Sequence, residues 1–254
     1  MTATLAAAVI DLHCHIVPGI DDGAGSLGDS VAMARQGAAD GIELICATPH
    51  IRHDHDVRID ELAGRVEDLN AELAEAGIAT RVATGGEVAE TAVADCGDDE
   101  LRRVTLGGGG RWILLEPAPG PLSDSLDRAV EELAARGFRS LIAHPERHLT
   151  PDLERRLAAL IEGGCLVQAT AAHVIAPDTA PAMRGLAERG LIHVLGSDAH
   201  SAIHGRPVEL SAGFATLGDV KTIEPHLEWV TRSAPAALIA GDEVAPPYPP
   251  AAIA

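Results

Sequence analysis

The sequence has few aromatic and few basic residues, and both shortages restrict what the protein can be. Aromatic side chains make up only 2% of the 254 residues, so a hydrophobic core has to be built from Ala, Val, Leu and Ile. Lys and Arg together number 19 against 38 Asp and Glu, which gives a formal net charge of −19. Because so acidic a chain is repelled by phosphate backbones and anionic lipids, neither nucleic acid nor an anionic membrane is expected as a partner.

Cysteines and long apolar runs are also scarce. The four cysteines, Cys14, Cys46, Cys96 and Cys165, are scattered and form no C-x-x-C pair. We therefore expect no disulfide framework and a reducing, cytoplasmic setting. No apolar stretch approaches the ~20 residues that span a bilayer, so we expect no membrane insertion. The N-terminal "MTATLAAAVI" lacks the basic start of a signal peptide, and we interpret it as the beginning of a first β-strand.

Seven apolar stretches rich in Val, Ile and Leu alternate with helical patterns along the chain. The stretches are "AAAVIDLHCH", "IELICATPH", "ATRVATGGE", "RWILLEP", "RSLIAHPE", "CLVQAT" and "LIHVLGSDAH". The clearest helical pattern covers 59–76, and shorter ones cover 123–136, 152–162 and 180–189. Glycines stand where helices are expected to end, at Gly41, Gly77, Gly137, Gly163 and Gly190. This alternation predicts a parallel α/β barrel or sheet with seven strands.

Residue types that bind metals gather at the ends of the predicted strands. In "VIDLHCHIVPGIDDG", residues 9–23, strand geometry places His13 and His15 on one face with Asp11 behind them. That pair alone is equally compatible with a metal site and with a polar strand end in a surface loop. However, six of the seven predicted strands end in such residues: His13 with His15, His50, Glu87, Glu116, His144, and Asp198 with His200. Because this edge of an α/β barrel or sheet carries the active site, the pattern predicts a metal site there.

The strand-end motifs resemble those of a known superfamily. In chain order, "DLHCH", "ATPH", "GGE", "LLEP", "AHPER" and "SDAH" resemble the PHP (polymerase and histidinol phosphatase) superfamily of metal-dependent phosphoesterases. The longer strings "HIVPGIDDGAGSLGDSVAMA", "AHPERH" and "GSDAH…GRP" are similar to one branch, the bacterial protein-tyrosine phosphatases of capsule and exopolysaccharide loci. The resemblance runs from about Val9 to Pro207 and implies a distorted seven-stranded (βα)7 TIM-like barrel, with its metal site at the C-terminal ends of the strands.

Two segments follow from this organisation. We expect residues 1–241 to form a single PHP barrel domain. The segment 242–254, which includes "APPYPPAAIA", is rich in proline and is expected to be an extended or disordered tail.

The resemblance also implies three divalent metal ions. The nine implied ligands are His13, His15, Asp22, His50, Glu87, Glu116, His144, Asp198 and His200. Asp21 and Asp22 are adjacent, and only the register of the family motif favours Asp22. Imidazole and carboxylate ligands without a thiolate are compatible with Mn, Fe, Co or Zn, and we expect manganese first among these.

Two arginines match the phosphate-binding positions of the family, Arg147 in "HPER" and Arg206 in "GRP". Arginine offers phosphate a planar fork that keeps its charge, while a divalent cluster lowers the pKa of water and neutralises the phosphoryl oxygens. The leaving phenolate of phosphotyrosine needs little protonation, although Asp198 or a ligand histidine is a candidate for proton transfer. The alternative for each arginine is a structural salt bridge to an acidic side chain.

A second phosphatase chemistry is formally present. "CATPHIR", Cys46 to Arg52, satisfies the C-x5-R pattern of cysteine-dependent phosphatases. That chemistry needs a thiolate at a glycine-rich turn whose backbone N–H groups hold phosphate at a helix N-terminus. Here Cys46 lies in an apolar strand stretch, Pro49 removes one donor and the interval contains no glycine. We therefore interpret Cys46 as a buried strand residue.

Together these features predict a cytoplasmic, metal-dependent phosphomonoesterase. The resemblance points to a protein-tyrosine phosphatase that acts on the phosphotyrosine tail of a bacterial kinase controlling polysaccharide synthesis or export. Two alternatives stay open: a small-molecule phosphatase, such as one for histidinol phosphate, and a non-catalytic PHP module that binds metal or phosphoprotein. His53 and His55 are interpreted as part of a solvated loop, with the lining of the substrate entrance as the alternative.

Overall fold

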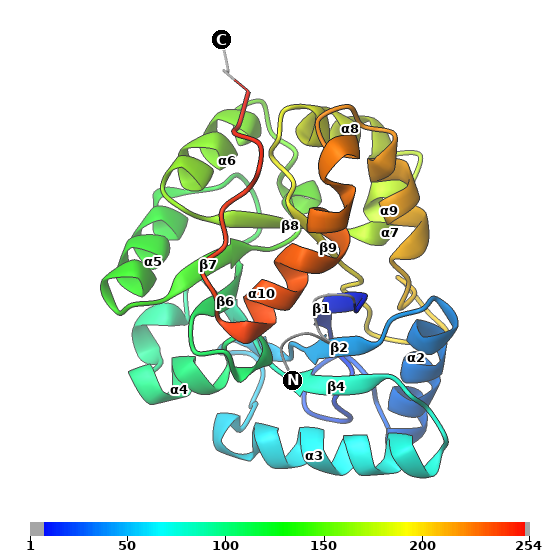
Figure 1. The fold of residues 1–254 in the computed structure, drawn as a ribbon. Helices are drawn as coiled ribbons and strands as arrows, with labels where there is room; N and C mark the ends of the chain where they lie inside the picture. Colours follow the sequence, from blue (N-terminus) through cyan, green and yellow to red (C-terminus); the bar gives the residue numbers. More distant parts are fainter. Residues whose placement is uncertain (1–7, 252–254) are drawn as a thin grey trace.

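Parallel strands and outer helices alternate along the chain. The computed structural model describes residues 8–251, so the part of the predicted first strand before Ala8 lies outside the described residues. The strands are β1 (Ile10–Cys14), β2 (Leu44–Ala47), β3 (His50–Ile51), β4 (Arg81–Thr84), β5 (Glu87–Ala89), β6 (Trp112–Glu116), β7 (Arg139–Ile142), β8 (Leu166–Thr170) and β9 (Val194–Gly196). They form two parallel sheets with the orders β1-β2-β4 and β3-β5-β6-β7-β8-β9 (Figure 1).

The two sheets continue one another across two short interruptions. β2 and β3 come from one predicted stretch and are separated by residues 48–49, while β4 and β5 come from another and are separated by residues 85–86. Pro49 has no N–H to donate to a strand partner, which is why the first interruption falls there. The β3–β5 pairing keeps the offset of the β2–β4 pairing, so the register survives both interruptions.

The outer edge of β1 lies beside the segment that follows β9. Cys14 and Ala199 form a parallel bridge, and the backbone N–H of His15 donates to the carbonyl of Ala199 at 2.9 Å. The backbone N–H of Asp198 donates to the carbonyl of His13 at 2.7 Å. The strands therefore form a curled parallel sheet, and a complete seven-stranded barrel stays a prediction.

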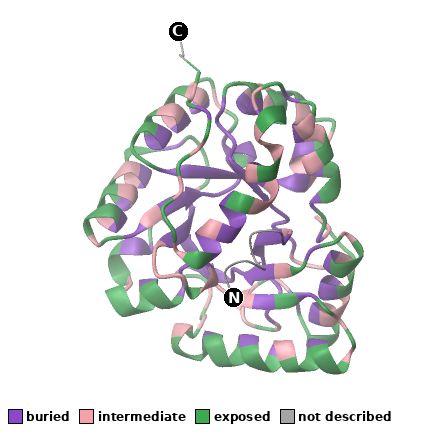
Figure 2. Ribbon diagram, in the orientation of Figure 1, coloured by how far each residue is buried: buried purple, intermediate pink, exposed green. Residues whose placement is uncertain are grey.

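Helices cover the outside of the curled sheet (Figure 1). The strands are buried, while the helices expose one face and bury the other (Figure 2). The helix predicted over 59–76 is confirmed, and its buried residues keep the three- and four-residue spacing. The α-helices are α2 (Leu27–Ala39), α3 (Ile59–Glu75), α4 (Asp98–Arg103), α5 (Asp124–Ala135), α6 (Leu153–Glu162), α7 (Ala171–Ile175), α8 (Ala180–Glu188), α9 (Ser211–Gly218) and α10 (Ala234–Ala240). Short 3₁₀ turns and one π-helical turn are η1 (Val93–Asp95), η2 (Leu106–Gly108), η3 (Pro145–His148), η4 (Glu224–His226) and η5 (Trp229–Ser233). Among the described residues, no helix is both long and apolar enough to cross a bilayer.

One predicted helix-ending glycine differs from the others. Four of the five have the positive φ that only glycine adopts without strain, for example +86° at Gly41. After α6, however, Gly163 is still right-handed, and the positive φ of +95° belongs to Gly164. The helix ends at Glu162, as the pattern over 152–162 predicts, but the left-handed residue is Gly164 instead of Gly163.

The last described segment, 242–251, contains no helix or strand and packs along the body of the protein (Figure 1, red). Tyr248 is buried, and its hydroxyl donates to the carbonyl of Ile192 at 2.8 Å. The indole N–H of Trp112 donates to the carbonyl of Asp242 at 2.9 Å. These contacts hold the segment against the N-terminal ends of β6 and β9, opposite the edge that carries the predicted site.

Candidate metal centre

Glu87 lies at the middle of the predicted site and contacts four histidines. Its Oε2 atom is 2.9 Å from Nδ1 of His50 and 3.4 Å from Nε2 of both His13 and His15. Its Oε1 atom is 2.8 Å from Nε2 of His144. Glu87 is the first residue of β5, and the four histidines lie in or just after β1, β3 and β7. The strand ends thus bring five of the predicted residues together.

The remaining four predicted residues join the same cluster. Oδ1 of Asp22 is 3.4 Å from Nε2 of His50 and 3.4 Å from Nε2 of His200. Oε2 of Glu116 is 3.7 Å from Nδ1 of His50, and Oδ1 of Asp198 is 3.7 Å from Nδ1 of His200. All nine predicted residues therefore belong to one connected group, which we call the nine-residue cluster. Within the described residues, three overlapping sets have ligand atoms close enough to share an ion: His15, Asp22, His50 and His200; His13, His15 and Glu87; and His50, Glu87 and Glu116.

The two adjacent aspartates of the first loop point in different directions. Asp21 is buried behind the cluster, where its Oδ2 accepts from Nδ1 of His15 at 2.8 Å and from the backbone N–H of His50 at 3.1 Å. Although burial acts to raise the pKa of Asp21, the hydrogen bond from His15 lowers it to about 2. The Asp22 side chain is 58% exposed and faces His50 and His200. Asp21 therefore fixes His15, and Asp22 is the one with a free carboxylate at the cluster.

Two further residues orient His13: Gln168, which was not predicted from the sequence, and Asp11, which was predicted to lie behind the histidine pair. Oε1 of Gln168, in β8, can only accept, so Nδ1 of His13 at 2.9 Å carries a proton and Nε2 is the nitrogen that faces the cluster. Asp11 lies behind the pair, where its Oδ1 accepts from the backbone N–H groups of His13 and Ser197. A polar residue inside the apolar stretch "CLVQAT" was the available signal for Gln168.

Several buried atoms of the cluster make no hydrogen bond of good geometry in the described part of the chain, although charged neighbours lie close to them. They include Oε2 of Glu87, Nδ1 of His50 and Oδ1 of Asp198. Buried polar atoms are nearly always satisfied in folded proteins, because leaving them unpaired costs about 1–3 kcal/mol each. Carboxylate and imidazole atoms that converge without partners are what divalent cations bind, so the residues present fit a metal cluster.

Protonation differs among the cluster histidines. Burial acts to lower the pKa of His13 and of His15, but the neighbouring carboxylates raise both, so a cation that binds there has to displace these protons. Burial lowers the pKa of His144 to about 4, so its imidazole is neutral at physiological pH. Burial acts to raise the pKa of Glu87, but the neighbouring charge of His13 and hydrogen bonds from the surrounding histidines hold it well below its ordinary value. A neutral imidazole and an ionised carboxylate are the forms that ligate metals.

Backbone strain is confined to this site. Among residues 8–251, only two non-glycine residues have positive φ, His144 at +33° and Asp198 at +49°. Such conformations cost of order 1–3 kcal/mol and cluster at functional sites. Both residues follow a strand end, where the turn aims the side chain back toward the cluster.

Both predicted arginines meet at Asp198. Nη2 of Arg147 is 2.5 Å from Oδ2 of Asp198, and Nη2 of Arg206 is 3.2 Å from the same oxygen. Nε of Arg206 donates to the backbone carbonyl of Asp198 at 2.7 Å. The salt bridge that was the alternative for each arginine is therefore present, and it is made to a residue of the nine-residue cluster.

A third arginine, Arg52, also reaches the cluster. This contact was not predicted from the sequence. Its Nη1 is 3.4 Å from Oε1 of Glu116, and its Nε and Nη2 are 2.9 and 2.5 Å from the carboxylate of Asp54. His55, from the same loop, stacks on His50 with ring centroids 5.1 Å apart, whereas the side chain of His53 is 66% exposed. Of the two loop histidines, His55 contacts the cluster, whereas His53 is exposed and pairs with Asp95 at 3.3 Å.

The cysteine-dependent alternative does not fit the structure. Cys46 is fully buried in β2, and burial raises the pKa of its thiol to about 12. Its Sγ lies 3.6 Å from the carbonyl of Thr84, and Arg52 is engaged with Asp54 and Glu116 instead. Cys46 is a buried strand residue, as the sequence predicts.

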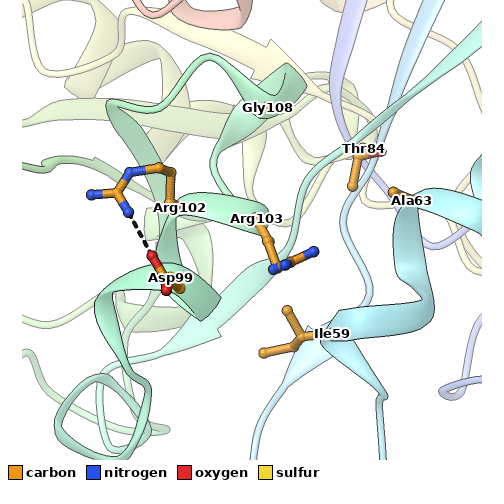
Figure 3. A pocket seen from close by; sticks show the side chains of 7 residues that line it. All are labelled: Ile59, Ala63, Thr84, Asp99, Arg102, Arg103 and Gly108. Carbon is orange, nitrogen blue, oxygen red and sulfur yellow. Dashed lines mark hydrogen bonds and ion pairs between the residues drawn. The ribbon is translucent and has the colours of Figure 1, made fainter.

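A separate cavity of about 440 Å³ lies between α3 and α4. Its lining includes Ile59, Thr84, Asp99, Arg102 and Arg103, and none of the nine predicted ligands (Figure 3). Arg102 is paired with Asp99 at 2.9 Å, while Arg103 extends toward Ile59. With no histidine and only one carboxylate, this cavity is no second metal site.

Comparison with known proteins agrees with the site. A family model described as "Capsular polysaccharide synthesis, CpsB/CapC" matches residues 9–239. This chain belongs to the CpsB/CapC family. One relative in this family, the tyrosine-protein phosphatase YwqE of Bacillus subtilis, is 33% identical over 204 residues, which cover 76% of this chain and 78% of YwqE. The tyrosine-protein phosphatase CpsB of Streptococcus pneumoniae is 27% identical, over 78% of this chain and 85% of CpsB.

Comparison with solved structures shows that the fold of this chain matches that of a CpsB/CapC relative. A structure from work on YwqE and CpsB, described there as unique metal-dependent tyrosine phosphatases, superimposes with a TM-score of 0.81. It is 27% identical and covers 96% of this chain and 99% of its own. An amidohydrolase of Mycoplasma synoviae shares the fold alone, with a TM-score of 0.55 at 13% identity.

Proposed function

We propose that this protein is a metal-dependent protein-tyrosine phosphatase. One observation carries the proposal: nine side chains of the types that ligate metals, from segments at several strand ends, form one cluster, and two arginines meet at its edge. Metal ligands alone would fit any PHP-like metal site, whereas arginines beside them fit a phosphate ester. The tyrosine-specific names of relatives such as YwqE support phosphotyrosine over the small-molecule and non-catalytic alternatives.

The nine-residue cluster is the proposed site of three divalent ions, with manganese expected first. The three overlapping sets of candidate ligand atoms support the proposal of three ions, and His15, His50 and Glu87 each belong to two of these sets. When bound, such ions supply positive charge that lowers the pKa of water and stabilises the phosphoryl oxygens. His13 and His15 are fixed for this role by Gln168 and Asp21.

Arg147 and Arg206 are the proposed phosphate clamp, and Asp198 positions both. In the structure, Oδ2 of Asp198 occupies the two guanidinium groups. Each arginine has five N–H donors, so donors remain for the oxygens of a phosphate ester besides those that contact Asp198. Since the guanidinium groups stay charged, they stabilise the phosphoryl oxygens as charge shifts during transfer.

The natural substrate is proposed to be a bacterial tyrosine kinase that controls polysaccharide synthesis, acted on in the cytoplasm. The family description, capsular polysaccharide synthesis, supports this setting. The architecture is proposed to be one PHP barrel of seven strands over residues 1–241, followed by a separate proline-rich tail. The bridge between Cys14 and Ala199 and the shared register of the two sheets support the barrel.

A substrate panel on manganese-loaded protein tests the function. We expect hydrolysis of a phosphotyrosine peptide with kcat/KM at least about 100-fold above that for a matched phosphoserine peptide and for histidinol phosphate. Glu87→Gln keeps the size of the side chain but removes its charge, and it should abolish turnover of every substrate. Faster turnover of histidinol phosphate than of the tyrosine peptide would replace the proposal with the small-molecule alternative.

A further inference from the structure

A second cavity lies directly beside the nine-residue cluster. It has a volume of about 270 Å³ and is lined by segments that follow β3, β5 and β6. Glu116, a member of the cluster, also lines this cavity. The other lining residues are Arg52, His53, Asp54, Ala89, Glu90, Thr91, Pro117, Ala118 and Pro119. Any group that fills the cavity therefore lies next to the carboxylate that faces the metal site.

The charges around the cavity make it unsuitable for phosphate. Asp54, Glu90 and Glu116 contribute three carboxyl groups, whereas Arg52 contributes the one guanidinium among its lining residues. That guanidinium is already engaged by the Asp54 carboxylate at 2.5 Å and reaches Glu116 at 3.4 Å. An anion would meet a net negative lining. A neutral group is favoured instead, and an aromatic ring also presents a positive edge to carboxylates.

The walls of the cavity suit an aromatic ring. Pro117, Ala118, Pro119 and Ala89 supply apolar surface, and Arg52 supplies a planar guanidinium whose side chain is 32% exposed. Rings pack against apolar carbons, and guanidinium groups stack on ring faces. Ligand pockets for drug-sized molecules measure about 300–1,000 Å³, so this cavity is large enough for one ring and too small for a folded peptide segment.

Glu116 links this cavity to the phosphate clamp. Its Oε1 atom is 3.4 Å from Nη1 of Arg52 and 3.8 Å from Nη1 of Arg147. Arg52 belongs to the cavity, whereas Arg147 is held by Asp198. The Glu116 carboxylate therefore contacts a lining residue of the cavity on one side and Arg147 of the proposed clamp on the other.

We propose that this cavity, the aryl pocket, receives the aromatic ring of the substrate, and that Arg52 is a specificity-determining residue. The inference rests on the proposed function and deepens it, because it explains how an aryl phosphate is selected over an alkyl phosphate. Asp54 is the positioning residue of the aryl pocket, since its carboxylate holds two nitrogens of the Arg52 guanidinium.

Binding of two phosphonates to the manganese-loaded protein tests the aryl pocket without requiring turnover. Benzylphosphonate and methylphosphonate share the anionic group, but only the first carries a ring. Isothermal titration calorimetry should give benzylphosphonate a Kd at least about tenfold lower in the unsubstituted protein. Ala118→Leu fills the cavity and Arg52→Ala removes its stacking face, so each should bring the Kd ratio to within about twofold of one.

Arg58→Ala is the matched control. Arg58 lies in the same loop, is exposed, pairs with Asp60 and does not line the cavity, so this variant should keep the tenfold ratio. Circular dichroism and manganese content verify that each variant is folded and loaded, and the two pocket variants test the proposal independently.

The outcomes separate this inference from the proposed function. Equal Kd values in the unsubstituted protein, or a ratio that survives both pocket variants, would overturn the aryl pocket even if phosphotyrosine is hydrolysed. A tenfold ratio that both pocket variants abolish would support it even if the protein hydrolysed no phosphotyrosine peptide, and that result would contradict the proposed function alone.

Discussion

At the scale of single residues, Asp198 connects the metal cluster to the arginines. Its Oδ1 atom is 3.5 Å from Nε2 of His13, while its Oδ2 atom contacts Arg147 and Arg206. The positive φ of Asp198, +49°, comes with a backbone carbonyl that accepts from Nε of Arg206. One strained residue thus joins the nine-residue cluster to both arginines, and loss of either arginine leaves the contact between Asp198 and His13 in place.

The first prediction concerns the arginines. Arg147→Ala and Arg206→Ala should each lower kcat/KM for a phosphotyrosine peptide about 100-fold, from ~3 kcal/mol of lost transition-state stabilisation. Manganese content should not fall, because neither side chain can ligate a cation. Lysine at either position should rescue only partly, since it lacks the planar fork.

Arg184→Ala is the control for the arginine variants, because Arg184 forms only an exposed pair with Glu188 on α8. It should leave kcat/KM within about twofold of the unsubstituted enzyme. Metal-replete Arg147→Ala and Arg206→Ala proteins that both kept near-native kcat/KM would remove the phosphate clamp from the mechanism.

The second prediction separates metal chemistry from cysteine chemistry. Cys46→Ser should retain most activity, because Cys46 is a buried thiol with no route to substrate. His50→Ala should lose most activity together with part of the bound manganese, since His50 contacts Asp22, Glu87 and Glu116. Steady-state kinetics and metal analysis on the two purified variants check this, and the reverse ranking would contradict the mechanism.

The residues that face the cluster could be predicted, but those that support them could not. His13 and His15 stand in one short motif, and strand geometry alone places them on one face. Gln168 orients His13 from 155 positions away in the chain, and Arg52 reaches Glu116 from 64 positions away. These contacts depend on which strands become neighbours and on how one loop folds, and no local pattern encodes either.

At the scale of elements, the glycines of "GGE" allow β4 and β5 to pass close to β2. A Cβ added at Gly85 would lie 2.6 Å from Sγ of Cys46 and 3.1 Å from the carbonyl of Ala47. Neither Gly85 nor Gly86 has positive φ, so the glycines are required by space and not by backbone conformation. Glu87 follows directly, and its position therefore depends on this close approach.

The interruptions at residues 48–49 and 85–86 were not predicted, because each stretch was interpreted as one strand, although Thr-Pro and Gly-Gly at these positions are local signals of a strand break. The helices were predicted from the sequence, because their periodicity is local and extends over several turns. The clearest pattern, over 59–76, became α3 with its last helical residue at Glu75.

The third prediction is that Gly85→Ala destabilises the fold by about 1–3 kcal/mol and lowers manganese affinity, because overpacking against β2 displaces Glu87. Gly64→Ala is the matched control: no atom lies within 4 Å of its added Cβ inside α3, so it should be neutral or stabilising by up to ~1 kcal/mol. Urea denaturation and manganese titration measure both effects.

A double variant locates the strain. Cys46→Ala removes the Sγ atom that the new Cβ would meet, so it should recover part of the stability lost by Gly85→Ala. A Gly85→Ala protein as stable and as manganese-rich as the unsubstituted one would show that the close approach is not required.

At the scale of the whole molecule, the curled sheet concentrates charge of one sign. The chain carries a formal net charge of −19, and Glu87, Glu116 and Asp198 are buried at one edge of the sheet. Carboxylates gathered in this way repel one another and are desolvated unless cations or partners neutralise them. The histidines and arginines of the site neutralise part of this charge, and divalent cations at the proposed site would neutralise more of it.

The last prediction is that metal removal affects stability and activity together. Chelation followed by buffer exchange should abolish turnover and lower the melting temperature, because an ion present at about 100 times its Kd stabilises the folded state by ~2.7 kcal/mol per site. Manganese should restore both, with cobalt, iron or zinc tested in parallel. Iodoacetamide should leave activity nearly intact, since Cys14, Cys46 and Cys165 are buried and only Cys96 is half-buried. Full turnover and an unchanged melting temperature in a rigorously metal-free sample would contradict the metal mechanism. If chelation instead lowers turnover and melting temperature together, and manganese restores the two together, the cluster contributes to both stability and activity.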